Sequence, residues 1–169
     1  MDACDENLVY LHLPAGSALP TLDTQPRRIV VLVSQQVTCE WQYKVSDWIV
    51  QTGCLYMMAW GMNCSSWDDS VDHANRKAFE PKEIPDENFV MTTWHAGEPM
   101  AEAFFFCRNC AFHPDIDLPN VVLLDINLSS RRDELIDRYW HSFDEIDTAT
   151  KATLRSRLTA WFNRTIKMR

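Results

Sequence analysis

The stretch RRIVVLV, residues 27–33, decides the fold of this 169-residue chain. Its unbroken run of aliphatic residues predicts a strand that is buried on both faces, as the strands of a parallel sheet are. The next segment predicts a helix, because apolar residues recur at helical spacing between Thr38, which can cap its start, and Gly53, which can end it. A buried strand followed by an amphipathic helix is the unit from which α/β folds are built.

The same alternation continues along the chain. Further buried strands are predicted at 54–61, 88–95 and 120–126, each followed by a helical segment. Four strands that alternate with helices predict a three-layer α/β sandwich with a mainly parallel sheet of four to five strands and C-terminal helices. The expected strand order is 2-1-3-4, as in flavodoxin-like or TIR-like folds. Residues 8–13, LVYLHL, could add an edge strand or pack on the rim.

The chain divides into three parts with different charge. We expect residues 1–26 to pack on the domain, residues 27–147 to form the α/β domain, and residues 148–169 to form a basic amphipathic helix. Residues 1–126 carry 18 acidic and 7 basic side chains, so this body should repel nucleic acid and anionic lipid. Any contact with nucleic acid would therefore use the basic segment, whose apolar face we expect to pack on the acidic body; a membrane surface or an acidic partner is the alternative.

Several classes of protein are disfavoured by what the sequence lacks. The N-terminus has acids where a signal peptide needs basic residues, and no apolar run could span a membrane, so we expect a cytoplasmic protein with no transmembrane segment. The six cysteines are expected to be reduced and mostly structural. The four glycines are not clustered, which disfavours dinucleotide and P-loop sites and predicts no cofactor.

Three polar stretches directly follow predicted strands: SQQVT at 34–38, WGMNCSSWDD at 60–69 and TTWHAGE at 92–98. Because the carboxyl ends of parallel strands meet at one edge of the sheet, we expect these stretches to converge where open α/β sheets bind ligands. Tryptophans among acids are typical of protein-binding hot spots, and also of pockets that stack a base or a sugar. The predicted binding residues are Trp60, Cys64, Ser65, Trp67, Asp68, Asp69, Asp72, His73, Thr93, Trp94 and His95.

The densest polar stretch is CSSWDDSVDHAN, residues 64–75. Ser66 with Asp69 three residues later is typical of a capping box, so a helix start explains most of these side chains. It does not explain Trp67, which would lie at the exposed mouth of that helix. The D-D-x-x-D spacing of residues 68–72 also occurs in Mg²⁺-dependent prenyl-diphosphate enzymes. Those proteins are all-helical and have a second acidic motif that this chain lacks, so no metal is predicted.

Two other groups of residues have catalytic or metal-binding types. His95 and Glu98 follow a predicted strand, and a histidine beside a carboxylate can act as a general acid and base; the alternative is a rim histidine hydrogen-bonded to a neighbouring loop. Cys107, Cys110 and His113 have a spacing that looks like zinc ligands. In a continuous helix these three side chains would point apart, which favours a buried helix that uses cysteine as a small apolar residue.

The strings WGMNCSSWDDSVDHAN, NFVMTTWHAGEP and NCAFHPDIDLPN resemble the core of a bacterial family of small uncharacterised α/β domains. The resemblance covers about residues 28–126 and marks the stretches 64–75 and 92–98 as signature segments of that family. It implies no particular reaction. The basic segment after residue 147 lies outside it.

The sequence therefore favours a non-enzymatic, acidic protein-binding module of the inhibitor, immunity or defence-accessory type. Its tryptophan- and aspartate-rich rim would contact a protein partner, and no complete catalytic constellation is recognisable. The alternative is an enzyme that acts on a nucleotide or nucleoside, TIR-like or glycosyl-hydrolysing. In that case Glu98 or His95 would be the acid/base and the tryptophans would stack the substrate.

Overall fold

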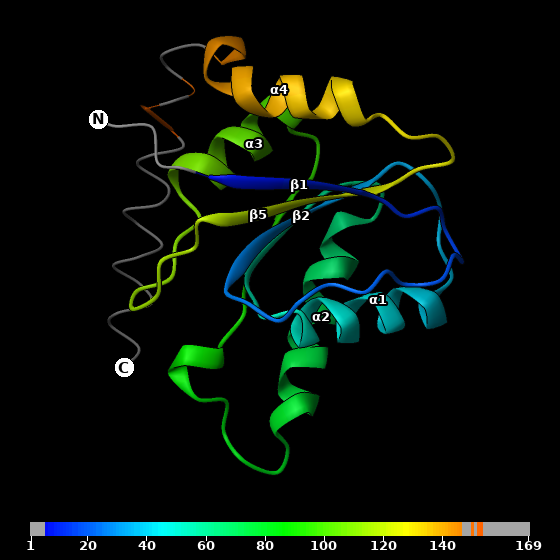
Figure 1. Cartoon of the computed structure of the whole chain (residues 1–169), viewed down its shortest axis with the longest axis vertical. Coiled ribbons are helices and arrows are strands. Elements are labelled where there is room, and N and C mark those ends of the chain that lie inside the picture. The colour runs from blue at the N-terminus through cyan, green and yellow to red at the C-terminus, as the bar shows by residue number, and fades with distance from the viewer. Residues whose placement is uncertain (1–5, 147–149, 151, 154–169) are drawn as a thin grey trace.

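All strands of the computed structural model lie in one parallel sheet, which helices cover on both faces (Figure 1). The structure describes residues 6–146, 150, 152 and 153. The predicted three-layer α/β sandwich is confirmed, and residues 8–12 of the stretch 8–13 belong to an edge strand. In spatial order the five strands of this part are β1 (Asn7–His12), β5 (Asn120–Ile126), β2 (Arg27–Val33), β3 (Cys54–Gly61) and β4 (Met91–His95).

The order of the strands differs from the predicted one. Counted over the four strands predicted between residues 27 and 126, it is 4-1-2-3 rather than 2-1-3-4, because β5 pairs with β2. The physical reason is burial. Residues 121–126 of β5 are at most 1% exposed, so this strand needs a neighbour on each side, whereas β4 carries polar and exposed residues that suit an edge. The second neighbour of β5 is β1.

The helices form two layers that pack on separate apolar cores, one on each face of the sheet. Residues of α1 and α2 pack in one core and residues of α3 and α4 pack in the other, so α1 and α2 share one layer and α3 and α4 share the other. The helices are α1 (Cys39–Gln51), α2 (Cys64–Phe79), α3 (Met100–Asn109) and α4 (Arg132–Glu145), with a short 3-10 helix η1 (Asp86–Asn88) before β4.

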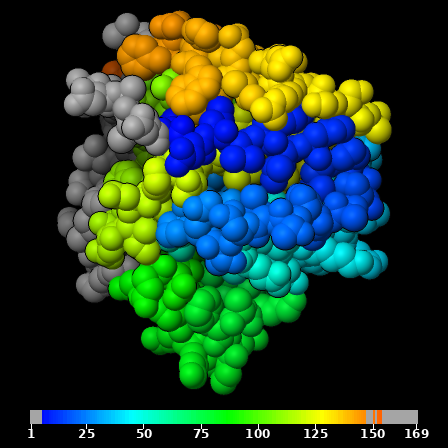
Figure 2. Space-filling view, viewed as in Figure 1, coloured from blue at the N-terminus to red at the C-terminus, as the bar shows by residue number. Residues whose placement is uncertain are grey.

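The connection from β1 to β2, residues 13–26, packs against α1 where another α/β protein would place a helix. The indole N–H of Trp41 donates to the carbonyl of Ser17 at 3.0 Å, and that of Trp48 donates to the carbonyl of Pro20 at 2.9 Å. In the space-filling view the chain before β2, in blue, covers the middle of this side of the molecule (Figure 2). The tryptophans that mark the apolar side of α1 therefore also hold this connection in place.

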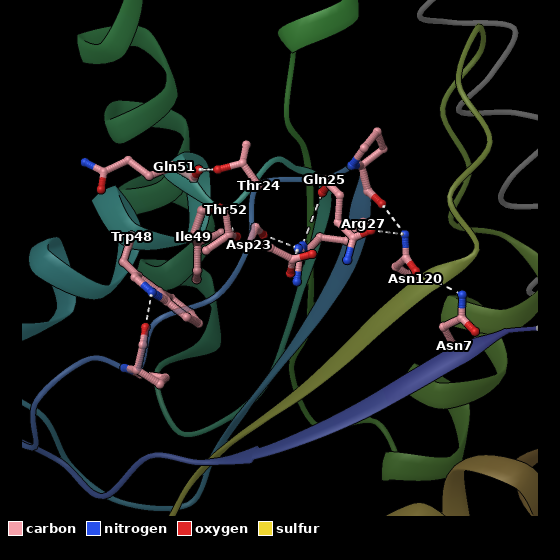
Figure 3. A network of polar contacts seen from close by, with 12 residues as sticks. Asn7, Asp23, Thr24, Gln25, Arg27, Trp48, Ile49, Gln51, Thr52 and Asn120 are labelled. Atoms are coloured by element: carbon pink, nitrogen blue, oxygen red, sulfur yellow. Dashed lines mark hydrogen bonds and ion pairs between the residues drawn. The ribbon is translucent and has the colours of Figure 1, made fainter.

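Polar contacts fix the end of the sheet where β2 and β5 begin (Figure 3). Arg27 is only 1% exposed, and its guanidinium lies 3.2 Å from the Asp23 carboxylate. The Asn7 amide donates to the side-chain oxygen of Asn120 at 3.1 Å, which joins β1 to β5. These contacts lie at the end of the strands opposite the candidate site.

The basic amphipathic helix predicted at residues 148–169 lies outside the described residues, except for Thr150, Ala152 and Thr153. None of the helices in the described part has the length and apolar character that crossing a membrane requires.

Candidate functional site

Helix α2 begins three residues earlier than a capping Ser66 implies. Its N-cap is Asn63, whose φ of 49° is left-handed, and the Ser66 hydroxyl donates to the Asn63 carbonyl at 2.8 Å. The preceding turn is tight, since a Cβ on Gly61 would approach the Val33 carbonyl oxygen to 2.2 Å. The predicted Ser66–Asp69 capping box is therefore wrong.

The early start of α2 turns Trp67 inward. Trp67 is 1% exposed and Cys64 is 2% exposed, and both belong to the core between the sheet and the α1–α2 layer. The expectation that Trp67 lies at an exposed helix mouth is wrong. Of the three tryptophans predicted at this edge, Trp60 is partly buried, and only Trp94, 53% exposed, shows most of its ring to solvent.

Asp68 and Asp72 lie one turn apart on α2, on the side that contacts β4. The Thr92 hydroxyl donates to Asp72 Oδ1 at 2.9 Å, whereas Asp68 Oδ1 is buried without a hydrogen-bond partner among the described residues. Burial raises the pKa of both carboxyl groups, and repulsion from Asp69 adds to each shift. Asp68 is therefore a buried acid whose charge costs stability.

Replacing Asp68 by asparagine is expected to raise the free energy of unfolding at pH 7 by about 1 kcal/mol, because it removes the negative charge from a buried carboxylate and leaves a neutral amide of the same shape. The pKa of Asp68 is higher in the folded chain than in the unfolded chain, so the folded state keeps the proton over a range in which the unfolded chain has lost it. Stability should thus fall as the pH rises above about 4, the ordinary aspartate value.

The gain from Asp68→Asn should accordingly disappear as the pH is lowered to about 4. Urea unfolding at both pH values measures this difference. Asp69→Asn, at the exposed neighbouring position, is the matched control and should change stability by less than about 0.5 kcal/mol. An equal gain in stability from Asp68→Asn and Asp69→Asn would contradict the proposal that burial of Asp68 is what destabilises the protein.

The sheet divides the predicted rim into two groups. Side chains alternate along β4, so Thr92 and Trp94 face the α2 layer, whereas Thr93 and His95 face the α3 layer. The residues predicted in 64–73 share the α2 side. The predicted binding residues are therefore not one continuous surface.

His95 and Glu98 do lie together on the α3 side. His95 Nδ1 is 2.8 Å from Glu98 Oε2, and the ring is 5% exposed, packed edge-on against Phe106. The Trp60 indole N–H donates to the Glu98 carbonyl at 2.8 Å. These contacts fasten the loop that follows β4 onto the end of the sheet.

A cavity of about 660 Å³ opens between the N-terminal ends of α1 and α2, where β2 and β3 end. The predicted binding residues that line it are Ser65, Trp67, Asp69 and His73. Gln35, Gln36, Met62 and Asn63 also line it; they belong to the stretches 34–38 and 60–69 that were expected at this edge, although they were not named as binding residues. Two further lining residues, Gln42 and Tyr43, lie on α1 outside those stretches.

Some of the side chains that line this cavity are hydrogen-bonded to each other, and others are not. The Gln42 amide donates to the Ser66 hydroxyl at 3.1 Å. The side chains of Gln36, Ser65 and Asp69 make no hydrogen bond within the described part of the chain. The cavity therefore has exposed polar groups that are available to a bound molecule.

A smaller cavity of about 230 Å³ adjoins the larger one along the groove between α1 and α2. The two share Tyr43, Ser70 and His73, and the Tyr43 and His73 rings are 6.4 Å apart between centroids. The smaller cavity is also lined by Asp47 and Lys77, which form an ion pair at 2.9 Å.

An arginine of this chain takes the place where open α/β sheets commonly bind ligands. The chain leaves β2 towards one face and β5 towards the other, so the switch in strand order falls between these two strands. There the Arg131 guanidinium lies 2.5 Å from Asp125 Oδ1 and 3.0 Å from the Ser34 hydroxyl. Asp125 is fully buried and also accepts a hydrogen bond from the Tyr10 hydroxyl at 2.8 Å. The larger cavity lies one strand further along, between β2 and β3.

Cys107, Cys110 and His113 have separate surroundings. Cys107 Sγ lies 3.8 Å from the Tyr139 hydroxyl, and His113 Nε2 lies 3.1 Å from the Asp86 carbonyl oxygen. Burial raises the pKa of the Cys107 thiol to about 11. Across residues 6–146, 150, 152 and 153, no group of three or more His, Cys, Asp and Glu side chains could hold a metal ion, and the five cysteines there are free.

The chain is similar over most of its length to a known protein family. The family model described as Domain of unknown function (DUF7684) matches residues 8–143, from β1 into α4. No curated protein and no solved structure matches the chain. The match covers most of the chain, including the cavity between α1 and α2. The chain therefore belongs to the family described as Domain of unknown function (DUF7684).

Proposed function

We propose that this domain binds a small polar molecule in the cavity between α1 and α2. The volume of about 660 Å³ is within the range of ~300–1,000 Å³ that is typical of small-molecule sites. The position at the carboxyl ends of parallel strands is also typical. The observation that carries the proposal is the set of polar side chains, Gln36, Ser65 and Asp69, that line the cavity without a hydrogen-bond partner in the described part of the chain.

Filling the cavity is expected to abolish this binding. Ser65 is exposed in the first turn of α2 and lines the cavity, so Ser65→Trp should occupy the site without entering the core. Ser129→Trp, at an exposed position between β5 and α4, is the matched control. In saturation-transfer NMR with a library of neutral and charged small molecules, bound compounds should lose at least about tenfold affinity for the Ser65→Trp protein and none for the control. If no compound is affected by Ser65→Trp alone, the proposal is wrong.

A protein-binding module is the second candidate, as an inhibitor, immunity or defence-accessory protein of bacterial origin. Exposed aromatic and methionine side chains favour it, since both types are enriched in protein interfaces. Trp94 is 53% exposed at the end of β4, and Met62 is 46% exposed at the mouth of the cavity. A side chain of the partner would then occupy the space that we assign to a small molecule.

The enzymatic alternative depends on His95 and Glu98. The imidazole is 5% exposed and is already hydrogen-bonded to the carboxylate, and neither residue lines the cavity. A general acid or base has to reach the bound molecule directly or through one water. We therefore favour binding over catalysis by this pair.

A further inference from the structure

The fixed charges around the larger cavity nearly cancel. The N-termini of α1 and α2 border it at Cys39 and Asn63, and a helix N-terminus carries about half a positive elementary charge. Asp69 supplies one negative charge, His73 is charged only when protonated, and no lysine or arginine is among the described residues that line the cavity. The two helix N-termini together supply about one positive charge, which the Asp69 carboxylate offsets, so the site favours neither an anion nor a cation.

The polar groups suit hydroxyl recognition. The Asp69 carboxylate has two acceptor oxygens and can accept from two adjacent hydroxyl groups, while Gln36 and Ser65 can each both donate and accept. Val37 and Met62 provide apolar wall beside them. A sugar ring offers the matching surface, because it has hydroxyl groups on its edge and C–H groups on its face.

We infer that the ligand is an uncharged molecule with a sugar-type ring that carries adjacent hydroxyl groups, either a nucleoside or a simple glycoside. This inference rests on the function proposed above. The aromatic rings that line the cavity support it. Tyr43 is 54% exposed, and its ring is 6.4 Å from that of His73 at an interplanar angle of 57°, so a planar base or the apolar face of a sugar can lie against the Tyr43 ring.

The same site disfavours the phosphorylated form of such a molecule. Phosphate groups are bound by arginine or lysine, or by helix N-termini that no carboxylate opposes. Here Asp69 lines the same cavity as both helix N-termini, and the lysine of the adjoining cavity, Lys77, is paired with Asp47. A nucleotide should therefore bind more weakly than its nucleoside.

Four probes test this ligand class by titration calorimetry: adenosine, methyl β-D-ribofuranoside, 2′-deoxyadenosine and AMP. We expect adenosine or the riboside to bind, and 2′-deoxyadenosine and AMP to bind at least about tenfold more weakly than adenosine if the nucleoside is the ligand. Binding of the riboside as tightly as adenosine would identify the sugar alone as the recognised part. Asp69→Asn should lower the affinity for the probe that binds by about tenfold or more, since a hydrogen bond to a charged acceptor is lost.

The matched control is Asp144→Asn, an exposed aspartate on α4, which should leave the affinity unchanged. Equal binding of the deoxy compound, tighter binding of AMP, or an Asp69→Asn protein that binds normally would each overturn the ligand class. If library compounds lose affinity for the Ser65→Trp protein but none of the four probes binds the unaltered protein, the proposed ligand class is wrong and the proposed function stands. If no compound responds to Ser65→Trp, both fail.

Discussion

Replacing Arg131 by alanine is expected to lower the free energy of unfolding by about 3–5 kcal/mol, as removal of one partner of a buried ion pair does. Asp125 is fully buried near the carboxyl end of β5, and the Arg131 guanidinium lies 2.5 Å from its carboxylate. The Tyr10 hydroxyl, at 2.8 Å, would still donate a hydrogen bond, but the negative charge would have lost its positive partner. Urea unfolding measures the loss.

The neighbouring arginine provides the control. Arg132 is exposed and lies 5.9 Å over the Tyr10 ring, so Arg132→Ala should cost less than about 1 kcal/mol. Adding Asp125→Asn to the Arg131→Ala protein should restore part of the lost stability, because it removes the uncompensated charge. Similar losses of stability from Arg131→Ala and Arg132→Ala would show that the Asp125–Arg131 pair does not contribute the stability that we assign to it.

Trp67→Ala is expected to lower the free energy of unfolding by about 3–5 kcal/mol, the usual cost of deleting a large aromatic side chain from a core. Trp67 is 1% exposed and is among the largest fully buried side chains of the described residues. Trp94→Ala is the matched control, because Trp94 is 53% exposed, and should change stability by less than about 0.5 kcal/mol. Equal effects of the two substitutions in urea unfolding would contradict the inward orientation of Trp67.

This pair also separates folding from binding. Loss of a partner by a Trp67 variant would report damage to the core. Loss of a partner by a Trp94 variant with unchanged stability would report a contact at the surface. The sequence placed both residues in one binding rim, and their different burial shows why a substitution at Trp67 cannot test that rim.

The strands could be predicted closely from the sequence, because buried parallel strands are local apolar runs. The ranges 27–33, 54–61 and 120–126 agree with β2, β3 and β5. The predicted strand at 88–95 is shorter, since β4 starts at Met91 and the residues before it include η1. The strand order could not be predicted in the same way, because it depends on pairing between segments that are distant in the chain.

The candidate site was harder to predict for two physical reasons. A change of three residues in the start of α2 turns the ring of Trp67 from the helix mouth into the core, and capping patterns do not fix helix starts that closely. The cavity is formed by side chains of α1, α2 and two loops, and no short sequence pattern describes such a space. Ser65, Asp69 and His73 were predicted individually and Gln36 belongs to a stretch expected at this edge, whereas the place of Tyr43 depends on how α1 and α2 pack.

The turn at Gly61 has a consequence for how a molecule would enter the cavity. The Met62 N–H donates to the Val33 carbonyl at 2.8 Å, and Gly61 leaves no room for a side chain against β2. Val33, Met62 and Asn63 line the cavity, so its walls are attached to two central strands rather than to a hinged segment. A molecule would therefore enter a preformed binding site, and little of the protein would become ordered when it binds. Selectivity would come from the fit of its shape and of its hydrogen-bonding groups.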